Sequence, residues 1–215
     1  LEAKYDSISY LPYFSQFLVE SNKKYGIMDK SGKIKLKVSY DEIKIGDNKN
    51  KLYVVKENNL YGMVNIDGEV LLATNFQKIG VDENDFEQNR LDNQYILVNE
   101  LIPVKYNNFW GFYNIKGEKV TDFIFFDVGC KESKVTNSYP VVEIPSLNLV
   151  VVKTDKTSYN LINRKGIIRI GAPLNSIYLK NDASTGKNTY YMTYGGTTEI
   201  TKDIEEFFAS MGASE

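Results

Sequence analysis

The chain has 215 residues, of which 42% are hydrophobic and 25% charged, and its formal net charge is -2. These values are typical of a folded globular protein and leave no excess of positive charge for a nucleic-acid partner. The absence of His excludes Ser-His and Cys-His nucleophile systems and imidazole metal sites, and a single Cys, Cys130, excludes an intrachain disulfide. We therefore expect no cofactor and no metal.

The first predicted element is a partial repeat over residues 1–20. Its segment Tyr5–Ile8 (YDSI) recurs as Tyr40–Ile43 (YDEI). The chain thus begins in the middle of a repeat, and because it starts at Leu1 rather than Met we expect that an upstream segment was removed. No apolar stretch approaches the roughly 18 to 20 residues of a membrane span, so we expect none in this segment.

Four copies of one motif follow: an aromatic residue, Gly, two apolar residues, Asp or Asn, any two residues, and Gly. The copies are Tyr25–Gly32 (YGIMDKSG), Tyr61–Gly68 (YGMVNIDG), Trp110–Gly117 (WGFYNIKG) and Tyr159–Gly166 (YNLINRKG). Only the last copy lacks the first Gly, which Asn160 replaces. The aromatic starts are 36, 49 and 49 residues apart. Periods of this length indicate a tandem-repeat architecture.

Each motif predicts a tight hairpin. The Asp or Asn caps the first position of a four-residue turn, and the Gly at the fourth position takes a positive φ. Strand-forming residues flank the turn; after the first copy, Lys33 to Val38 alternate Lys with aliphatic residues. One repeat is therefore about three antiparallel strands. The predicted motif residues are Tyr25, Gly26, Asp29, Gly32, Tyr61, Gly62, Asn65, Gly68, Trp110, Gly111, Asn114, Gly117, Tyr159, Asn163 and Gly166.

The repeats predict one domain over residues 1–215. After the partial repeat, the full repeats cover 21–50, 51–97, 98–147 and 148–185, followed by a degenerate hairpin and capping helix over 186–215. Insertions at about 80–94, 129–145 and 180–188 fall at one place in the repeat and should lie on one side of the structure. In the last element Thr201 is the predicted N-cap, and Ile204, Phe207, Phe208 and Met211 recur at helical spacing.

The predicted fold class is all-β, with tandem three-stranded antiparallel meander repeats and a short C-terminal helix. The units can stack as an open solenoid-like array or curve into a propeller-like ring. Four and a half units of unequal length favour the open array.

The recurring motif resembles the WG (KWG) repeat family of bacterial proteins. The aromatic-Gly start, the Asp/Asn-x-x-Gly turn and the later aromatic-acid-x-Ile element carry the resemblance, over about residues 3–180. The chain departs from the family pattern at Asn160, at the enlarged repeats and beyond about residue 185. The resemblance implies an all-β repeat domain, often in exported or envelope-associated proteins. It implies no general enzymatic activity and no shared ligand, so no functional residue is carried over.

Several residues outside the motif are candidate site residues. The acidic segment Asp82–Glu87 offers oxygen ligands for Ca²⁺ but lacks the Gly and closing Glu of an EF-hand, so a solvated loop is the simpler interpretation. A hydrolase needs a carboxylate pair, for which the candidates are Asp82, Asp85, Glu100, Asp127 and Glu143. Cys130 has no base partner in the sequence and is interpreted as a buried residue.

The sequence therefore predicts a binding or scaffolding module that is not an enzyme, at a bacterial cell envelope or exported, with a cytoplasmic location also open. Its expected partner is a protein or a cell-wall glycan. The repeated aromatic residues are expected to fill the core, with a glycan-stacking groove as the alternative. The other functional alternatives are a structural spacer with no ligand of its own and a carboxylate-dependent glycoside hydrolase.

Overall fold

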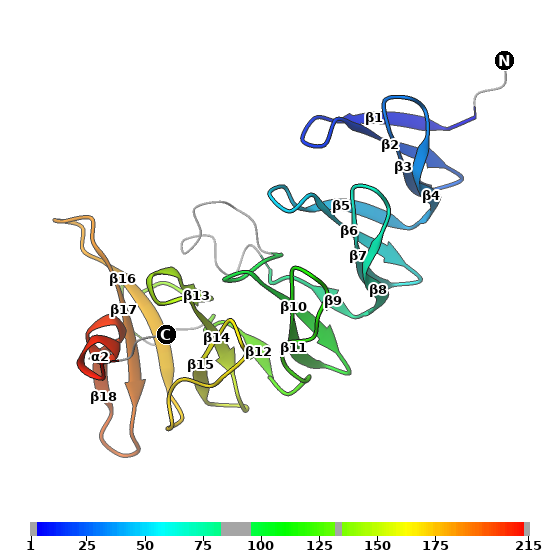
Figure 1. Ribbon diagram of the computed structural model, residues 1–215. Helices are drawn as coiled ribbons and strands as arrows, with labels where there is room; N and C mark the ends of the chain where they lie inside the picture. Colours follow the sequence, from blue (N-terminus) through cyan, green and yellow to red (C-terminus); the bar gives the residue numbers. More distant parts are fainter. Residues whose placement is uncertain (1–3, 83–95, 132–134, 213–215) are drawn as a thin grey trace. The chain divides into compact units, whose positions relative to one another are not determined.

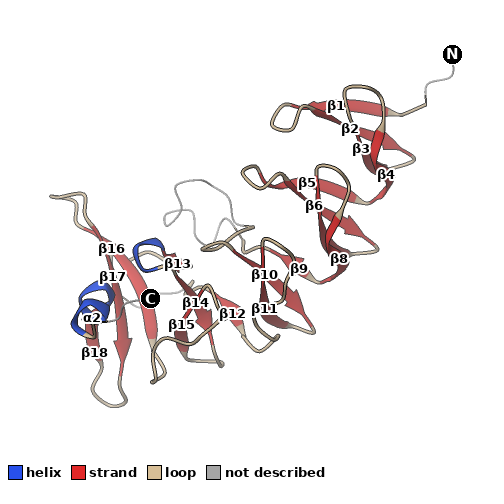
Figure 2. Cartoon of the chain, in the orientation of Figure 1, coloured by secondary structure: helices blue, strands red, loops and turns tan. Residues whose placement is uncertain are grey.

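The computed structural model describes residues 4–82, 96–131 and 135–212, and these form strands and turns with one short α-helix (Figure 1, Figure 2). The all-β class is confirmed. The strands are β1 (Ser7–Leu11), β2 (Gln16–Ser21), β3 (Lys24–Met28), β4 (Ile34–Tyr40), β5 (Glu42–Asp47), β6 (Leu52–Glu57), β7 (Leu60–Asn65), β8 (Val70–Phe76), β9 (Lys78–Ile79), β10 (Leu101–Tyr106), β11 (Phe109–Asn114), β12 (Asp127–Val128), β13 (Glu143–Ile144), β14 (Leu149–Lys153), β15 (Tyr159–Asn163), β16 (Ser176–Asn181), β17 (Asn188–Tyr194) and β18 (Ile200–Asp203). The helices are the 3-10 helix η2 (Pro145–Leu147) and the α-helix α2 (Ile204–Ser210).

The strands of the described ranges form small antiparallel sheets that do not close into a barrel. Their orders are β1-β2-β3-β4, β5-β6-β7-β8, β11-β10-β9, β12-β14-β13 with β15 on β14, and β16-β17-β18. The first two sheets hold a fourth strand beyond the three expected, because each Tyr-Asp-x-Ile segment begins a strand that pairs with the next one. Ile43, for example, lies opposite Val55 in the β5–β6 ladder.

Contacts divide the chain into two compact units. Unit 1 comprises Leu1–Ile79, Val104–Asn107 and Ile115–Glu118, and unit 2 the remaining segments, Gly80–Pro103, Asn108–Asn114 and Lys119–Glu215. Within unit 1, β1–β4 and β5–β8 are two successive meanders of the same design (Figure 1). The single repeat domain expected from the sequence remains a prediction.

The first, second and fourth motif turns are built by one hydrogen-bond pattern. In the first copy the Asp29 carboxylate accepts from the backbone N–H groups of Ser31 and Lys33, at 2.9 and 3.0 Å. The Asn65 and Asn163 side-chain oxygens accept from the corresponding two N–H groups of their own turns. The Ser31 hydroxyl also donates to Asp29, and this bond is the main reason that the pKa of Asp29 lies below its usual value. These bonds fix the hairpin locally, before any packing.

The second Gly of the motif also carries packing between repeats. A Cβ on Gly68 would lie 2.2 Å from the carbonyl oxygen of Lys35, in the preceding sheet. A Cβ on Gly117 would lie 2.6 Å from the carbonyl oxygen of Leu71, and a Cβ on Gly166 would lie 2.5 Å from Cγ2 of Thr121. By contrast, nothing lies within 4 Å of a Cβ on Gly32. Gly68 therefore serves turn geometry and contact between repeats, whereas Gly32 serves the turn alone.

The aromatic starts of the motif differ in burial. Trp110 is 4% exposed and packs in a core cluster of unit 2 with Phe112 and Phe125. Tyr25, Tyr61 and Tyr159 are half-buried. The Nζ atoms of Lys56 and Lys153 lie over the rings of Tyr61 and Tyr159, 5.2 and 5.4 Å from the ring centres. The role of Tyr61 and Tyr159 is thus packing combined with a cross-strand cation–π contact.

Asn160 occupies the place of the missing motif Gly. It is 6% exposed, and its Nδ2 donates to the carbonyl oxygen of Ile170 at 2.8 Å. Its Oδ1 accepts from the backbone N–H of Leu161 at 2.8 Å and of Ile170 at 3.3 Å. In the second copy the next strand comes so close to Gly62 that a Cβ would lie 2.6 Å from the Leu72 carbonyl oxygen. The amide therefore fills, in the fourth copy, the space that the Gly leaves for backbone in the others.

The C-terminal helix is present, but its cap lies two residues after the predicted one. Asp203 is the N-cap, and its carboxylate accepts from the backbone N–H groups of Glu205 and Glu206. The prediction of Thr201 as the N-cap is wrong, because Thr201 lies in β18, opposite Thr193. Ile204 and Phe208 are the helix residues buried against unit 2.

Removing this cap should weaken the helix. We expect Asp203→Ala to lower the free energy of unfolding by about 1 kcal/mol, because two N–H groups lose their acceptor. Lys202→Ala should cost less than about 0.5 kcal/mol, since Lys202 is an exposed strand residue. Urea denaturation of both variants measures the difference, and equal losses would contradict Asp203 as the cap.

Candidate functional site

The carboxylates proposed from the sequence have structural partners where the structure describes them. Glu100 pairs with the guanidinium of Arg164 at 3.3 Å, and Asp127 with the ammonium of Lys131 at 2.9 Å. Glu143 accepts from the backbone N–H of Asn99 at 2.6 Å. Glu100 and Glu143 thus lie in one network around Asn99. Asp85 and the rest of the acidic segment after Asp82 lie outside the described residues.

Cys130 is fully buried in a core cluster of unit 2, and its backbone pairs with Val141. Among the described residues, no group of three or more Cys, Asp or Glu side chains is arranged to hold a metal ion. The described part of the chain contains no helix long and apolar enough to cross a membrane.

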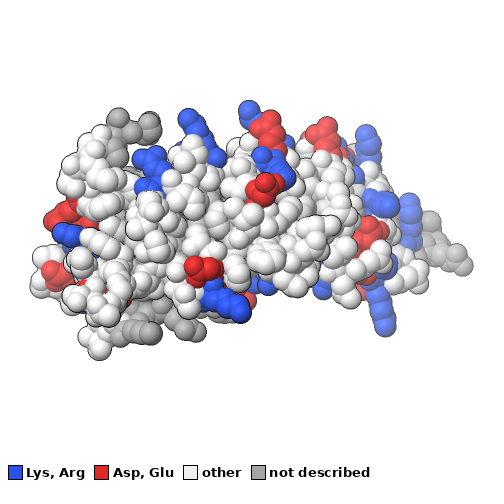
Figure 3. Space-filling view, turned by 90° about the horizontal axis from the view of Figure 1, so that it is seen from below, with Lys and Arg blue, Asp and Glu red and all other residues white. Residues whose placement is uncertain are grey.

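Several exposed aromatic rings of the described residues contact a second ring. In unit 2, Phe109 and Phe126 are 38% and 40% exposed and meet edge to face, with ring centres 5.4 Å apart. In unit 1, the exposed Tyr10 meets Phe17 at 5.3 Å. Figure 3 shows Lys and Arg side chains interspersed with Asp and Glu on one face, with broad uncharged areas between them.

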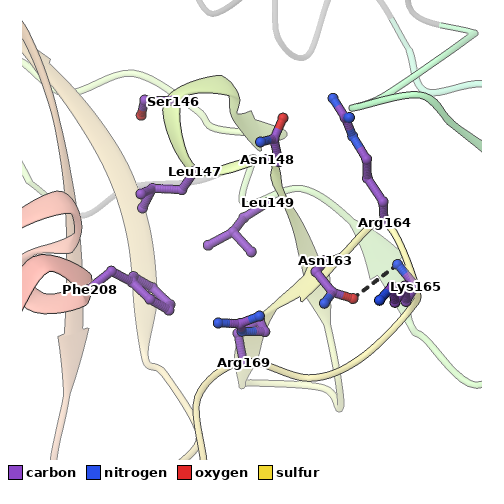
Figure 4. A pocket seen from close by; sticks show the side chains of 9 residues that line it. All are labelled: Ser146, Leu147, Asn148, Leu149, Asn163, Arg164, Lys165, Arg169 and Phe208. Atoms are coloured by element: carbon purple, nitrogen blue, oxygen red, sulfur yellow. Dashed lines mark hydrogen bonds between the residues drawn. The ribbon is translucent and has the colours of Figure 1, made fainter. Parts of the chain in front are cut away.

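A cavity of about 380 Å³ lies in unit 2, where the fourth repeat meets the C-terminal helix (Figure 4). This volume is at the lower end of the roughly 300–1,000 Å³ that is usual for small-molecule sites. We call it the turn cavity. Its lining residues are Ser146, Leu147, Asn148, Leu149, Asn163, Arg164, Lys165, Arg169 and Phe208.

Three local structures position this lining. Pro145 starts η2, and Asn148 ends it in the left-handed region with φ 52°, donating its N–H to the carbonyl oxygen of Pro145. The motif turn after β15 holds Asn163, Arg164 and Lys165. Phe208 reaches the cavity from α2. The turn cavity thus depends on a repeat motif and on the helix that follows the repeats.

Cations dominate the polar side of the turn cavity. Arg164 is engaged, because its Nε donates to Asn99 Oδ1 at 3.2 Å and its guanidinium pairs with Glu100. Arg169 lies over the ring of Phe208, 6.0 Å from the ring centre, and points into the space below Leu149 (Figure 4). Lys165 is exposed. The described lining contains three cations and no carboxylate, which suits an anionic ligand.

Sequence reasoning missed this cavity. Arg164 and Arg169 are two of the three Arg residues in the chain, and that scarcity was the available signal. Leu149 and Phe208 carry no such signal, since their residue types are common in any hydrophobic core. In the structure they are 3% and 5% exposed. Their convergence with the turn depends on tertiary packing that no local pattern encodes.

The sheets and turns define a β-repeat protein with a small cationic cavity. Residues 25–61 match the family model of the WG containing repeat, so the resemblance is confirmed for this repeat. The matched segment runs from one motif aromatic to the next, Tyr25 to Tyr61.

No curated protein is similar enough in sequence to match the chain. Among solved structures, one titled "Crystal structure of the eukaryotic initiation factor" is similar over 88% of this chain and 52% of that chain, with 10% identity and a TM-score of 0.38. The present chain thus spans about half the length of that chain. A TM-score this low carries no argument about function.

Proposed function

We propose that the chain is a non-catalytic binding module that recognises a glycan of the bacterial cell envelope. The observation that carries this proposal is the turn cavity, whose described lining combines three cations with two side-chain amides and a hydroxyl. Groups of these kinds bind oxygen-rich ligands by charge and hydrogen bonds. The repeat motif itself supports a modular role, because its recurring residues are occupied in turns and packing.

The hydrolase alternative receives less support from the geometry. Glu100 and Asp127 are each engaged with a cation, and the described lining of the turn cavity offers no carboxylate that could act as acid or nucleophile. A glycan that enters this cavity would be held by hydrogen bonds and charge rather than cleaved.

Co-sedimentation with insoluble bacterial cell-wall material tests the proposed function. We expect the wild-type chain at micromolar concentration to pellet with the wall and Lys165→Glu to pellet several-fold less, because it places a negative charge in the turn cavity. Lys116→Glu is the matched control, since Lys116 has the same place in the third motif turn but does not line the turn cavity. It should pellet like the wild type.

Complete recovery of the wild-type chain in the supernatant would contradict wall binding and favour a protein partner or a spacer role. Equal loss of binding in the two Lys variants would assign retention to overall charge rather than to the turn cavity. Trp110 is a poor optical probe for this experiment because it is buried in a different core cluster from Phe208.

A further inference from the structure

We propose that the turn cavity binds the carboxylate of an acidic sugar, a hexuronate unit of a glycan, and that Arg169 is the residue that receives it. This inference rests on the proposed function, because it names the ligand class of the same cavity. Its first support is the contrast between the two arginines. Arg164 already has a carboxylate and an amide oxygen as partners, whereas no described acid pairs with Arg169.

Arg169 is also held in place before a ligand arrives. It is half-buried, and its guanidinium lies over the ring of Phe208, 6.0 Å from the ring centre. Phe208 itself is fixed in the core cluster that includes Leu149 and Ile204. A planar guanidinium in a fixed position binds a carboxylate through two parallel hydrogen bonds and loses little side-chain entropy in doing so.

The rest of the lining suits sugar hydroxyls. The Asn163 side-chain oxygen is occupied by two backbone N–H groups of its turn, at 3.0 Å each, so its Nδ2 remains as a donor. Asn148 offers a second amide across the cavity (Figure 4). The Ser146 hydroxyl donates to Glu205 and keeps its oxygen as an acceptor. Leu147 lies on the Phe208 side, where it can contact the C–H face of a sugar ring.

A peptide fits this cavity less well than a sugar. An extended peptide gains much of its affinity by adding a strand to an unpaired sheet edge. At the turn cavity Leu149 lies opposite Ile144 on one side and Asn163 on the other. Because β14 has neighbours on both sides, it offers no such edge, and recognition falls to side-chain groups.

Titration calorimetry with a matched pair of ligands tests this inference. The probes are an oligosaccharide of glucuronic acid and the same oligosaccharide after chemical reduction of its carboxyl groups. We expect the acidic form to bind at least 10-fold more tightly to the wild-type chain, which is the usual effect of a charge-assisted hydrogen-bonded pair. The preference should weaken as salt is raised.

Variants place the effect on Arg169. Arg169→Gln should lose the preference for the acidic oligosaccharide. Arg169→Lys should keep part of it, because Lys keeps the positive charge but cannot form the two parallel hydrogen bonds of a guanidinium. Lys187→Gln removes the same charge from an exposed position outside the turn cavity and should bind like the wild type. Thermal melting of each variant separates lost binding from lost folding.

Equal binding of the two oligosaccharides would overturn the inference. So would binding of a peptide with a free C-terminus that depends on Arg169 and exceeds that of the acidic oligosaccharide. If wall retention persists in either case, the proposed function stands and only the ligand class is wrong. If the chain is not retained on the wall at all, the proposed function is wrong, and the inference that rests on it falls with it.

Discussion

Gly68→Ala should lower the free energy of unfolding by about 3 kcal/mol or more. The positive φ of 90° alone costs an L-residue roughly 1–2 kcal/mol. In addition, the new Cβ would lie 2.2 Å from the Lys35 carbonyl oxygen, a separation that forces the neighbouring repeat to move. Such a shift would also strain the ion pair between Lys35 and Asp67, whose Nζ and Oδ1 atoms are 2.9 Å apart.

Gly32→Ala is the matched control for this prediction. Gly32 has nearly the same φ, 86°, at the same place in its turn, yet nothing lies within 4 Å of its Cβ position. Its substitution should therefore cost only the backbone strain of roughly 1–2 kcal/mol. Chemical denaturation of the two variants gives the difference between their free energies of unfolding, which measures the contribution of the contact between repeats. If both substitutions cost the same, the close approach at Gly68 contributes nothing to stability.

Introducing the glycine of the other motif copies at position 160 should also destabilise the chain, by about 2–4 kcal/mol. Asn160→Gly removes a buried amide and leaves the N–H and the carbonyl group of Ile170 without their partner. It also adds the entropy cost of Gly in a strand. A substitution toward the motif consensus would then be harmful because the local backbone has adapted to the amide.

The reverse change in the second copy tests the same idea. Gly62→Asn should destabilise unit 1 strongly, because its Cβ would lie 2.6 Å from the Leu72 carbonyl oxygen and no space for an amide exists. As a control, Asn181→Gly removes an exposed strand amide and should cost about 1 kcal/mol or less. An Asn160→Gly variant as stable as the wild type would contradict the account of this site.

Much of the fold could be predicted from the sequence because the repeat is locally encoded. Asp29 and Asn163 cap their turns through bonds that span two to four residues, and such bonds depend on little else. The alternation of Lys with aliphatic residues over Lys33 to Val38 predicts β4, and this pattern is likewise local. The sequence pattern predicts Ile43 as a recurring apolar position but does not predict its strand β5. That strand forms only by pairing with β6, a later segment of the same chain.

The candidate site was beyond sequence reasoning for a related physical cause. Arg169 and Phe208 are 39 positions apart in the sequence, and their contact arises only when α2 packs on the fourth repeat. The position of the helix cap shows the same limit on a smaller scale. Thr201 and Asp203 are both acceptable caps by residue type, and pairing of β18 with β17 decides between them.

The most direct test of the binding account is a map of the ligand contact by NMR chemical-shift changes. Titration of the labelled chain with soluble cell-wall fragments should shift the amides of residues 146–149, 163–165 and 169, which line the turn cavity, together with Phe208. Amides of the first motif turn, around Gly32, should remain unchanged. Shifts confined to unit 1, or an absence of shifts at saturating fragment, would contradict the turn cavity as the binding site.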